Sequence, residues 1–170
     1  SDLVAVGDDA VRHPRGRLDD GHRQQVADPT GEAPGTVVVD TASRFLYLVE
    51  PGGTAMRYGV GVGRPGFEWS GIQRVSAKRE WPSWTPPKEM LQRRPDLPRY
   101  MAGGIENPLG ARALYIYKDG KDTLYRLHGS PEWYSIGKSV SSGCVRLIRC
   151  SRKRQQADRT SPPWLVPTDP

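Results

Sequence analysis

Hydrophobic residues in this chain come in short runs that have the length of β-strands. Residues 36–40 are rich in valine, and residues 45–49 form the continuous apolar run Phe-Leu-Tyr-Leu-Val. The four residues between them, 41–44, are enough for a hairpin loop. The pattern therefore predicts two neighbouring strands joined by a turn.

Apolar side chains alternate with glycines between residues 56 and 63. Tyr58, Val60 and Val62 are expected on one face of a strand and the three intervening glycines on the other. A glycine-lined face allows another backbone or a ligand to come close. A bulged or twisted strand without functional meaning explains the pattern equally well.

Prolines and tryptophans dominate the next distinctive stretch, Trp-Pro-Ser-Trp-Thr-Pro-Pro at 81–87. Each proline pushes the residue before it toward an extended conformation, so this segment is predicted to be stiff and non-helical. Residues 88–93 then read as a short helix, with proline tolerated at its start and Pro95 ending it. We interpret the tryptophans between residues 69 and 87 as covering the core, with the lining of a groove as the alternative.

Two further strands are predicted at 113–117 and 123–127, joined by the turn Asp-Gly-Lys-Asp at 119–122. The second strand places His128 at its end. For the chain as a whole we expect six or more short strands and one short helix. The sequence thus predicts a mainly β domain, a sandwich or barrel-like fold with one or two short helices.

The two ends of the chain lack these patterns. Residues 1–33 are polar, with turn signals and no sustained periodicity, and are interpreted as an extended or poorly ordered lead-in. Residues 150–170 are highly charged and then proline-rich, a composition that disfavours ordering. The predicted organisation is a lead-in at 1–33, one domain at 34–149 and an atypical tail at 150–170.

Composition sets limits on the possible functions. The 170 residues include 36% hydrophobic residues, 19 glycines and 16 prolines, which suits strands and turns better than a helical bundle. No run approaches the ~20 apolar residues of a membrane span, and no signal peptide is visible. The net charge of +6 favours anionic partners, but the basic residues are scattered and lack a nucleic-acid recognition motif.

The chain has two cysteines, Cys144 and Cys150, too few for a disulfide framework. A zinc site built from these two and His128 would be one ligand short of a closed tetrahedral shell. We therefore expect neither a metal nor a cofactor.

One thiol and one imidazole lie in compact motifs, His-Gly-Ser at 128–130 and Ser-Ser-Gly-Cys-Val-Arg-Leu at 141–147. A nucleophilic cysteine needs a neighbouring base or cation, and histidine is the side chain that exchanges protons near pH 7. Gly143 would allow a substrate carbonyl to approach the amides around Cys144. A buried cysteine and a hydrogen-bonded histidine, merely close in sequence, are the alternative.

The two motifs together resemble the L,D-transpeptidase catalytic domain, or YkuD domain, of bacterial cell-wall enzymes. That family carries His-Gly-(Ser/Thr), a spacer, and Ser-(His/Ser)-Gly-Cys-(Val/Ile)-Arg-(Leu/Met). The spacing of 16 positions from His128 to Cys144 is typical of its short-spaced branch. Further segments that resemble the family lie at 34–40, 45–49, 58–63 and 107–114.

The resemblance implies a β-sandwich with a capping helix and a catalytic Cys–His pair. Cys144 would attack a peptide carbonyl and form a thioester, while His128 takes the proton and passes it to the leaving amine. The carbonyl of Gly129 or of Ser130 would orient the imidazole. The amides of Gly143 and Cys144 would stabilise the oxyanion.

Three more residues of the second motif receive roles by the same resemblance. Ser141 is expected to brace the turn. Arg146 would meet a substrate carboxylate, or else form a structural ion pair. Ser142 stands where many relatives have a second histidine, and with Ser130 it is placed among the substrate-binding residues.

The implied donor substrate is a tetrapeptide stem of peptidoglycan, cut before its terminal D-Ala. The acceptor would be an amine on another stem or on an envelope protein, or water. The implied location is the periplasm or cell envelope, where an anionic wall would suit the basic charge, although the chain shows no export signal. A thiol peptidase or carboxypeptidase with the same pair of residues is one alternative. An inactive wall-binding module is the other, because the residues after Leu147 depart from the family pattern.

Overall fold

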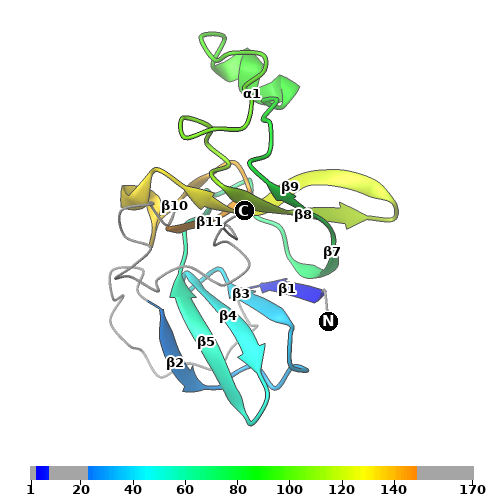
Figure 1. Cartoon of the computed structure of the whole chain (residues 1–170), viewed down its shortest axis with the longest axis vertical. Helices are drawn as coiled ribbons and strands as arrows, with labels where there is room; N and C mark the ends of the chain where they lie inside the picture. The colour runs from blue at the N-terminus through cyan, green and yellow to red at the C-terminus, as the bar shows by residue number, and fades with distance from the viewer. Residues whose placement is uncertain (1–2, 8–22, 149–170) are drawn as a thin grey trace.

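The computed structural model describes residues 3–7 and 23–148, and β-strands are the main regular structure among them (Figure 1). In chain order the strands are β1 Leu3–Gly7, β2 Gln24–Ala27, β3 Val37–Asp40, β4 Phe45–Glu50, β5 Thr54–Gly59, β6 Val62–Gly63, β7 Gly71–Glu80, β8 Arg112–Lys118, β9 Lys121–Ser130, β10 Ser139–Ser141 and β11 Val145–Ile148. The helix α1 spans Lys88–Arg93, and a 3-10 turn, η1, spans Trp133–Ser135. The mainly β prediction with one or two short helices is confirmed.

The described strands form one large sheet and one small one. The order in the large sheet is β11-β9-β8-β7-β1-β3-β4-β5-β2, and β10 pairs with β6 in the small sheet. Most neighbours run antiparallel, but β1 is parallel to β3, and β11 is parallel to β9. The helix α1 has no buried residue and, with its flanking loops, extends away from β2–β5 (Figure 1).

Both predicted hairpins are present, and each has a local cause. β3 and β4 pair from Asp40↔Phe45 to Val37↔Leu48, with the Asp40 carboxylate accepting the Ser43 N–H at 3.0 Å. β8 and β9 are joined by the two residues Asp119 and Gly120, whose φ values are 50° and 76°. Positive φ at both central positions matches the right-handed twist of the flanking strands, so an Asp-Gly pair favours this turn.

The glycine-lined segment at 56–63 is divided between β5 and β6. A Cβ at Gly61 would lie 2.6 Å from the Ser135 carbonyl oxygen, and one at Gly63 would lie 2.6 Å from the Phe67 carbonyl oxygen. The glycine face is thus occupied by neighbouring backbone, one of the two possibilities that the pattern left open. Gly61 also exchanges two backbone hydrogen bonds with Arg146, which attaches β11 to this segment.

Five strands, β1, β2, β7, β10 and β11, lie where the sequence did not predict them. β1 and β2 fall inside residues 1–33, the segment interpreted as an extended or poorly ordered lead-in. β1 pairs with both β3 and β7, and Val4 and Val6 are buried. β7 was missed because its sequence is largely polar, and pairing with β1 and β8 holds it in the sheet. The predicted tail at 150–170 lies outside the described residues.

The main core cluster includes side chains from both halves of the large sheet. It contains buried side chains of β1, β3, β4 and β5 together with Leu127 of β9 and with Val145 and Leu147 of β11. A second cluster, on the opposite face of β3–β5, includes Phe45 and Tyr47. No helix within the described ranges is long and apolar enough to cross a membrane.

Candidate active site

The pairing of β9 with β11 brings the two sequence motifs together. The register is Val145↔Leu127, Arg146↔His128 and Leu147↔Gly129. Successive side chains of a strand point to opposite faces. Because Leu127, Val145 and Leu147 point into the core, the opposite face carries His128 and Arg146.

Cys144 directly precedes β11. Continuing the register by one residue sets it opposite Arg126 and diagonal to His128. The predicted nucleophile and the predicted base therefore share one face of two adjacent strands.

His128 is buried and oriented by its own backbone neighbour. Its Nδ1 lies 2.7 Å from the Gly129 carbonyl oxygen. A carbonyl can only accept, so Nδ1 must carry the proton, which leaves Nε2 as a base. Burial is the main cause that lowers the pKa of His128 to about 4; the hydrogen bond to Gly129 opposes it, and the charges of Arg146 and Arg126 add to it. The imidazole is therefore neutral near pH 7.

The carbonyl of Gly129, one of the two predicted candidates, is thus the group that orients the imidazole. Ser130, whose carbonyl was the other candidate, is also buried, and its hydroxyl accepts the Glu132 N–H at 3.1 Å.

Cys144 is half-buried beside β9. Its Sγ lies 3.9 Å from the Leu124 carbonyl oxygen, a weak contact in which the thiol donates. Burial raises the pKa of the Cys144 thiol, against the opposing effects of the Arg126 backbone N–H and the charges of Arg126 and Arg146. The thiol and the imidazole are both neutral in the resting protein.

Ser141 braces the turn that carries the thiol. Its buried hydroxyl donates to the Cys144 carbonyl at 2.6 Å and accepts the Gly143 N–H at 3.2 Å. The Gly143 N–H, one of the two predicted oxyanion donors, is therefore used inside the turn. The other predicted donor is the Cys144 N–H. Ser142 is half-buried between these residues.

Two aromatic residues that the sequence did not single out contact the same turn. Trp69 Nε1 donates to the Gly143 carbonyl at 2.9 Å, and the Trp69 ring stacks on Tyr125 at 5.1 Å with an interplanar angle of 11°. Gly143 has φ 106°, and a Cβ there would lie 2.3 Å from Tyr125 Cε1. Only glycine fits this position. Trp69 packs against the main core cluster, as interpreted for the tryptophans of residues 69–87, but its hydrogen bond to the turn had no signal in the sequence.

Arg146 forms an ion pair with Glu132. Its Nε is buried and has no hydrogen-bond partner among the residues that the structure describes. The structural ion pair is thus the alternative that the structure displays. The guanidinium still acts on the site, because its charge lowers the pKa values of both His128 and Cys144.

The family-like segment at 107–114 packs against the backbone that orients His128. Gly110 has φ 67°, and a Cβ there would lie 2.7 Å from the Gly129 oxygen that orients His128. Asn107 is fully buried. Its Nδ2 donates to the Pro82 carbonyl at 3.0 Å, and its Oδ1 accepts the Leu109 N–H at 2.9 Å.

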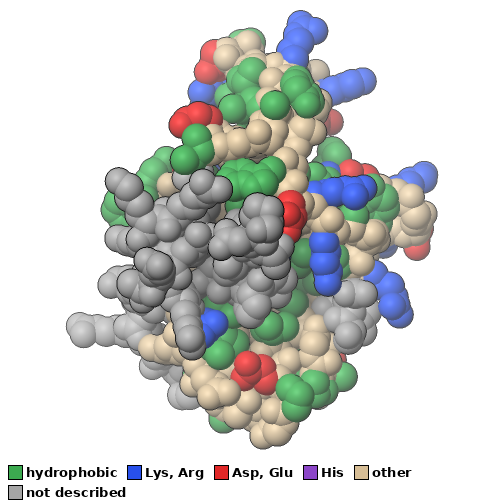
Figure 2. Space-filling model, viewed as in Figure 1, with side chains coloured by type: hydrophobic (Ala, Val, Ile, Leu, Met, Phe, Trp, Pro, Cys, Tyr) green, Lys and Arg blue, Asp and Glu red, His purple; other side chains and the backbone are tan. Residues whose placement is uncertain are grey.

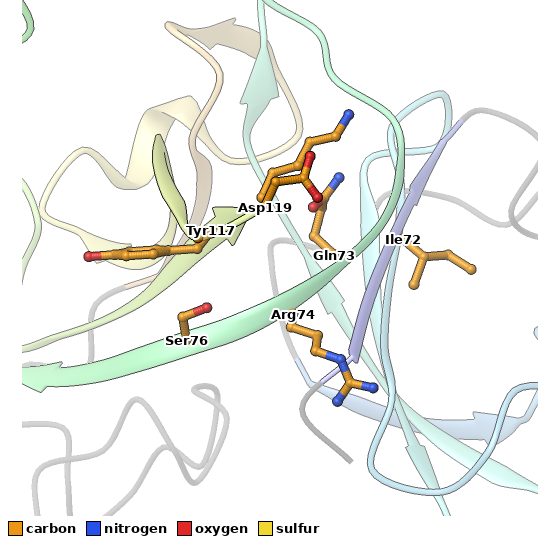
Figure 3. Close-up of a pocket in the computed structure, with 8 residues that line it drawn as sticks. Ile72, Gln73, Arg74, Ser76, Tyr117 and Asp119 are labelled. Carbon is orange, nitrogen blue, oxygen red and sulfur yellow. The ribbon is translucent and has the colours of Figure 1, made fainter.

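A separate depression of about 550 Å³ lies between β7 and the β8–β9 turn (Figure 3). Its lining consists of Ile72, Gln73, Arg74, Ser76, Tyr117, Lys118, Asp119 and Gly120. None of these is a predicted site residue. Among the described residues, no cluster of three or more His, Cys, Asp or Glu side chains could hold a metal ion, and Cys150 lies outside them.

Comparison with known protein families identifies the family of the chain. A sequence model of the YkuD family, the L,D-transpeptidase catalytic domain, matches residues 34–162. The chain belongs to this family. The match covers the predicted domain and also the first part of the predicted tail.

Curated relatives of the family agree with this assignment. The chain is 34% identical over 120 residues to the probable L,D-transpeptidase ErfK/SrfK of Escherichia coli strain K12, covering 65% of this chain and 36% of the relative. It is 32% identical over 132 residues to the probable L,D-transpeptidase YbiS of the same strain, covering 73% and 41%. The chain thus spans about two-fifths of the length of these relatives.

A solved structure is similar over most of the chain. It is a protein from Brucella melitensis described as a "probable carnitine operon oxidoreductase caia". The two are 44% identical, the TM-score is 0.58, and the match covers 85% of this chain and 86% of that one. The fold therefore also occurs in a protein described by a different activity.

Proposed function

We propose that the protein is a peptidoglycan L,D-transpeptidase in which Cys144 is the nucleophile and His128 the general base. One observation carries the proposal. In this member of the YkuD family, the pairing of β9 with β11 brings the Cys144 thiol to the same face as the oriented imidazole of His128. The donor is a tetrapeptide stem, and the product that leaves is D-Ala.

The first half-reaction forms a thioester. As Sγ of Cys144 attacks the carbonyl of the third stem residue, His128 Nε2 takes the thiol proton. The Cys144 N–H donates to the oxyanion, and one such donor contributes on the order of 3 kcal/mol. When the tetrahedral intermediate collapses, the bond to D-Ala breaks and His128 returns the proton to the leaving amine.

The second half-reaction reverses these roles. An acceptor amine attacks the thioester while His128 takes a proton from it, and the new amide forms as the Cys144 thiol is restored. The acceptor is an amine on another stem or on an envelope protein. With water as acceptor, the same steps give a carboxypeptidase.

The resting electrostatics favour this general-base mechanism. Burial keeps both groups neutral, so the proton moves only when a substrate arrives. A neutral His128 also leaves Nε2 free to accept.

The charge of the chain suits an envelope substrate. The net charge is +6, and Lys and Arg side chains are spread over the face seen in Figure 2 without forming one patch. A dispersed positive surface attracts an extended anionic wall through long-range forces that salt weakens. The proposed location is the periplasm or the cell envelope.

The test combines product analysis with covalent labelling. Incubation with tetrapeptide muropeptides should give cross-linked or exchanged products and free D-Ala. A carbapenem should form a covalent adduct with Cys144, which mass spectrometry detects. Cys144→Ala should abolish both results, while Cys150→Ala should retain them. Product formation by Cys144→Ala would refute the mechanism. The absence of any adduct on the unmodified chain would favour the binding module.

A further inference from the structure

The Gly143–Cys144 peptide group carries hydrogen-bonding atoms on both edges. A trans peptide is planar, with its C=O and its N–H pointing in opposite directions. Here the C=O belongs to Gly143 and the N–H to Cys144. Whatever holds the Gly143 carbonyl therefore also sets the direction of the Cys144 N–H.

Trp69 holds that carbonyl from a distant part of the chain. Its indole Nε1 donates to the Gly143 oxygen at 2.9 Å, across 74 positions of sequence. This hydrogen bond also polarises the peptide, which strengthens the N–H at its other edge as a donor.

The indole is itself fixed in place. It stacks on Tyr125 with centroids 5.1 Å apart, and both rings pack against the main core cluster. The edge of Tyr125 lies where a Cβ of residue 143 would stand, so both of the stacked rings contact the turn. A donor with so little freedom can hold a peptide plane to the tolerance that catalysis requires.

We propose that Trp69 is a positioning residue for the oxyanion site, aiming the Cys144 N–H at the acyl oxygen by binding the Gly143 carbonyl. This inference rests on the proposed function of Cys144. Trp69 acts on the transition state through the Gly143–Cys144 peptide plane. The position of the Cys144 thiol depends instead on its contacts with β9.

Two reagents separate these effects. Acylation of Cys144 by an activated ester, p-nitrophenyl acetate, or by a carbapenem passes through an oxyanion. Alkylation of the same thiol by iodoacetamide is a displacement at carbon and forms no oxyanion. A residue that aims an oxyanion donor should therefore affect acylation alone.

Trp69→Phe retains a stacking ring and removes the N–H. The acylation rate constant should fall roughly 10- to 100-fold, less than the loss of ~10²–10³ for deleting a donor outright. The alkylation rate constant should stay within about twofold. Trp81→Phe, at a tryptophan that is 44% exposed, is the matched control and should change neither rate.

A second variant guards against misfolding. Benzothienylalanine at position 69 keeps the shape of the indole and replaces the N–H with sulfur, so it should reproduce the loss of acylation with an unchanged melting temperature. Equal losses of acylation and alkylation, or unchanged acylation, would overturn the proposal.

A failure of the proposed function would look different. The unmodified chain would then be acylated by the activated ester but would give no product from muropeptides. The acylation and alkylation rates of the Trp69 variants could still be compared.

Discussion

At the scale of single residues, burial keeps the Cys144 thiol and the His128 imidazole uncharged in the resting site. It lowers the pKa of His128 to about 4 and raises the pKa of Cys144, so both groups are neutral over a wide range of pH. A preformed thiolate–imidazolium pair would require the opposite shifts. The site therefore depends on proton transfer during attack, which makes the position of His128 critical.

The pH profile follows from these directions. His128 works as a base only when unprotonated, and its lowered pKa means that protonation removes activity only as pH falls through about 4. We expect kcat/KM for thioester formation to rise through about pH 4 and to stay level to neutrality. Stopped-flow acylation between pH 3.5 and 8 measures this. A rise centred above pH 6 would show that the imidazole is not buried as described.

Loss of the base gives a second prediction at this scale. His128→Ala should lower transfer by at least ~10², the lower range for a positioned acid–base group. His13→Ala and His22→Ala are the controls and should leave the rate unchanged. Muropeptide exchange followed by mass spectrometry gives the three rates. A comparable loss in either control would mean that a different histidine is the base.

At the scale of elements, a loop supports the strand that carries His128. Gly110, next to Asn107 and Leu109 in a buried network, packs against the carbonyl of Gly129. That carbonyl fixes the tautomer of His128. The loop between α1 and β8 thus acts on a strand residue through a single backbone oxygen.

Gly110→Ala tests this connection. Its Cβ would displace the Gly129 oxygen, so we expect transfer to fall about tenfold or more, and ¹⁵N NMR of the His128 ring should show a weakened Nδ1–H bond. Gly120→Ala is matched for backbone strain, since Gly120 has φ 76° but open space around it. The control should lose about 1 kcal/mol of stability and keep its activity. Equal activity losses in both variants would attribute the effect to strain alone.

Local elements were predictable and distant pairings were not. The β8–β9 hairpin and α1 follow from an Asp-Gly turn and from proline boundaries, which act within a few residues. β1 owes its place to strands more than thirty residues away, and it was missed. In the candidate site, the motifs indicated Cys144 and His128. The contact of Trp69 with the Gly143 carbonyl was not predicted, because it joins residues 74 positions apart and no sequence motif links them.

At the scale of the whole molecule, β1 connects two halves of the large sheet. On one side β7 leads through β8 to β9 and β11, which carry the candidate site, and on the other β3 leads to β4, β5 and β2. The main core cluster includes side chains from both halves. A segment that the sequence alone placed outside the domain is therefore expected to control the stability of the site.

Val4→Asp tests this dependence. Val4 is fully buried in β1, and an unpaired carboxylate there should cost several kcal/mol, enough to lower the unfolding midpoint sharply and to abolish acylation of Cys144 at 37 °C. Ile72→Asp is the control on the adjacent strand, because Ile72 pairs with Ala5 and is 66% exposed. It should change the free energy of unfolding by no more than about 0.5 kcal/mol. Urea denaturation followed by tryptophan fluorescence compares the two variants. If Val4→Asp unfolds at the same urea concentration as the unmodified chain, β1 does not hold the two halves together, and the site depends only on β7, β8, β9 and β11.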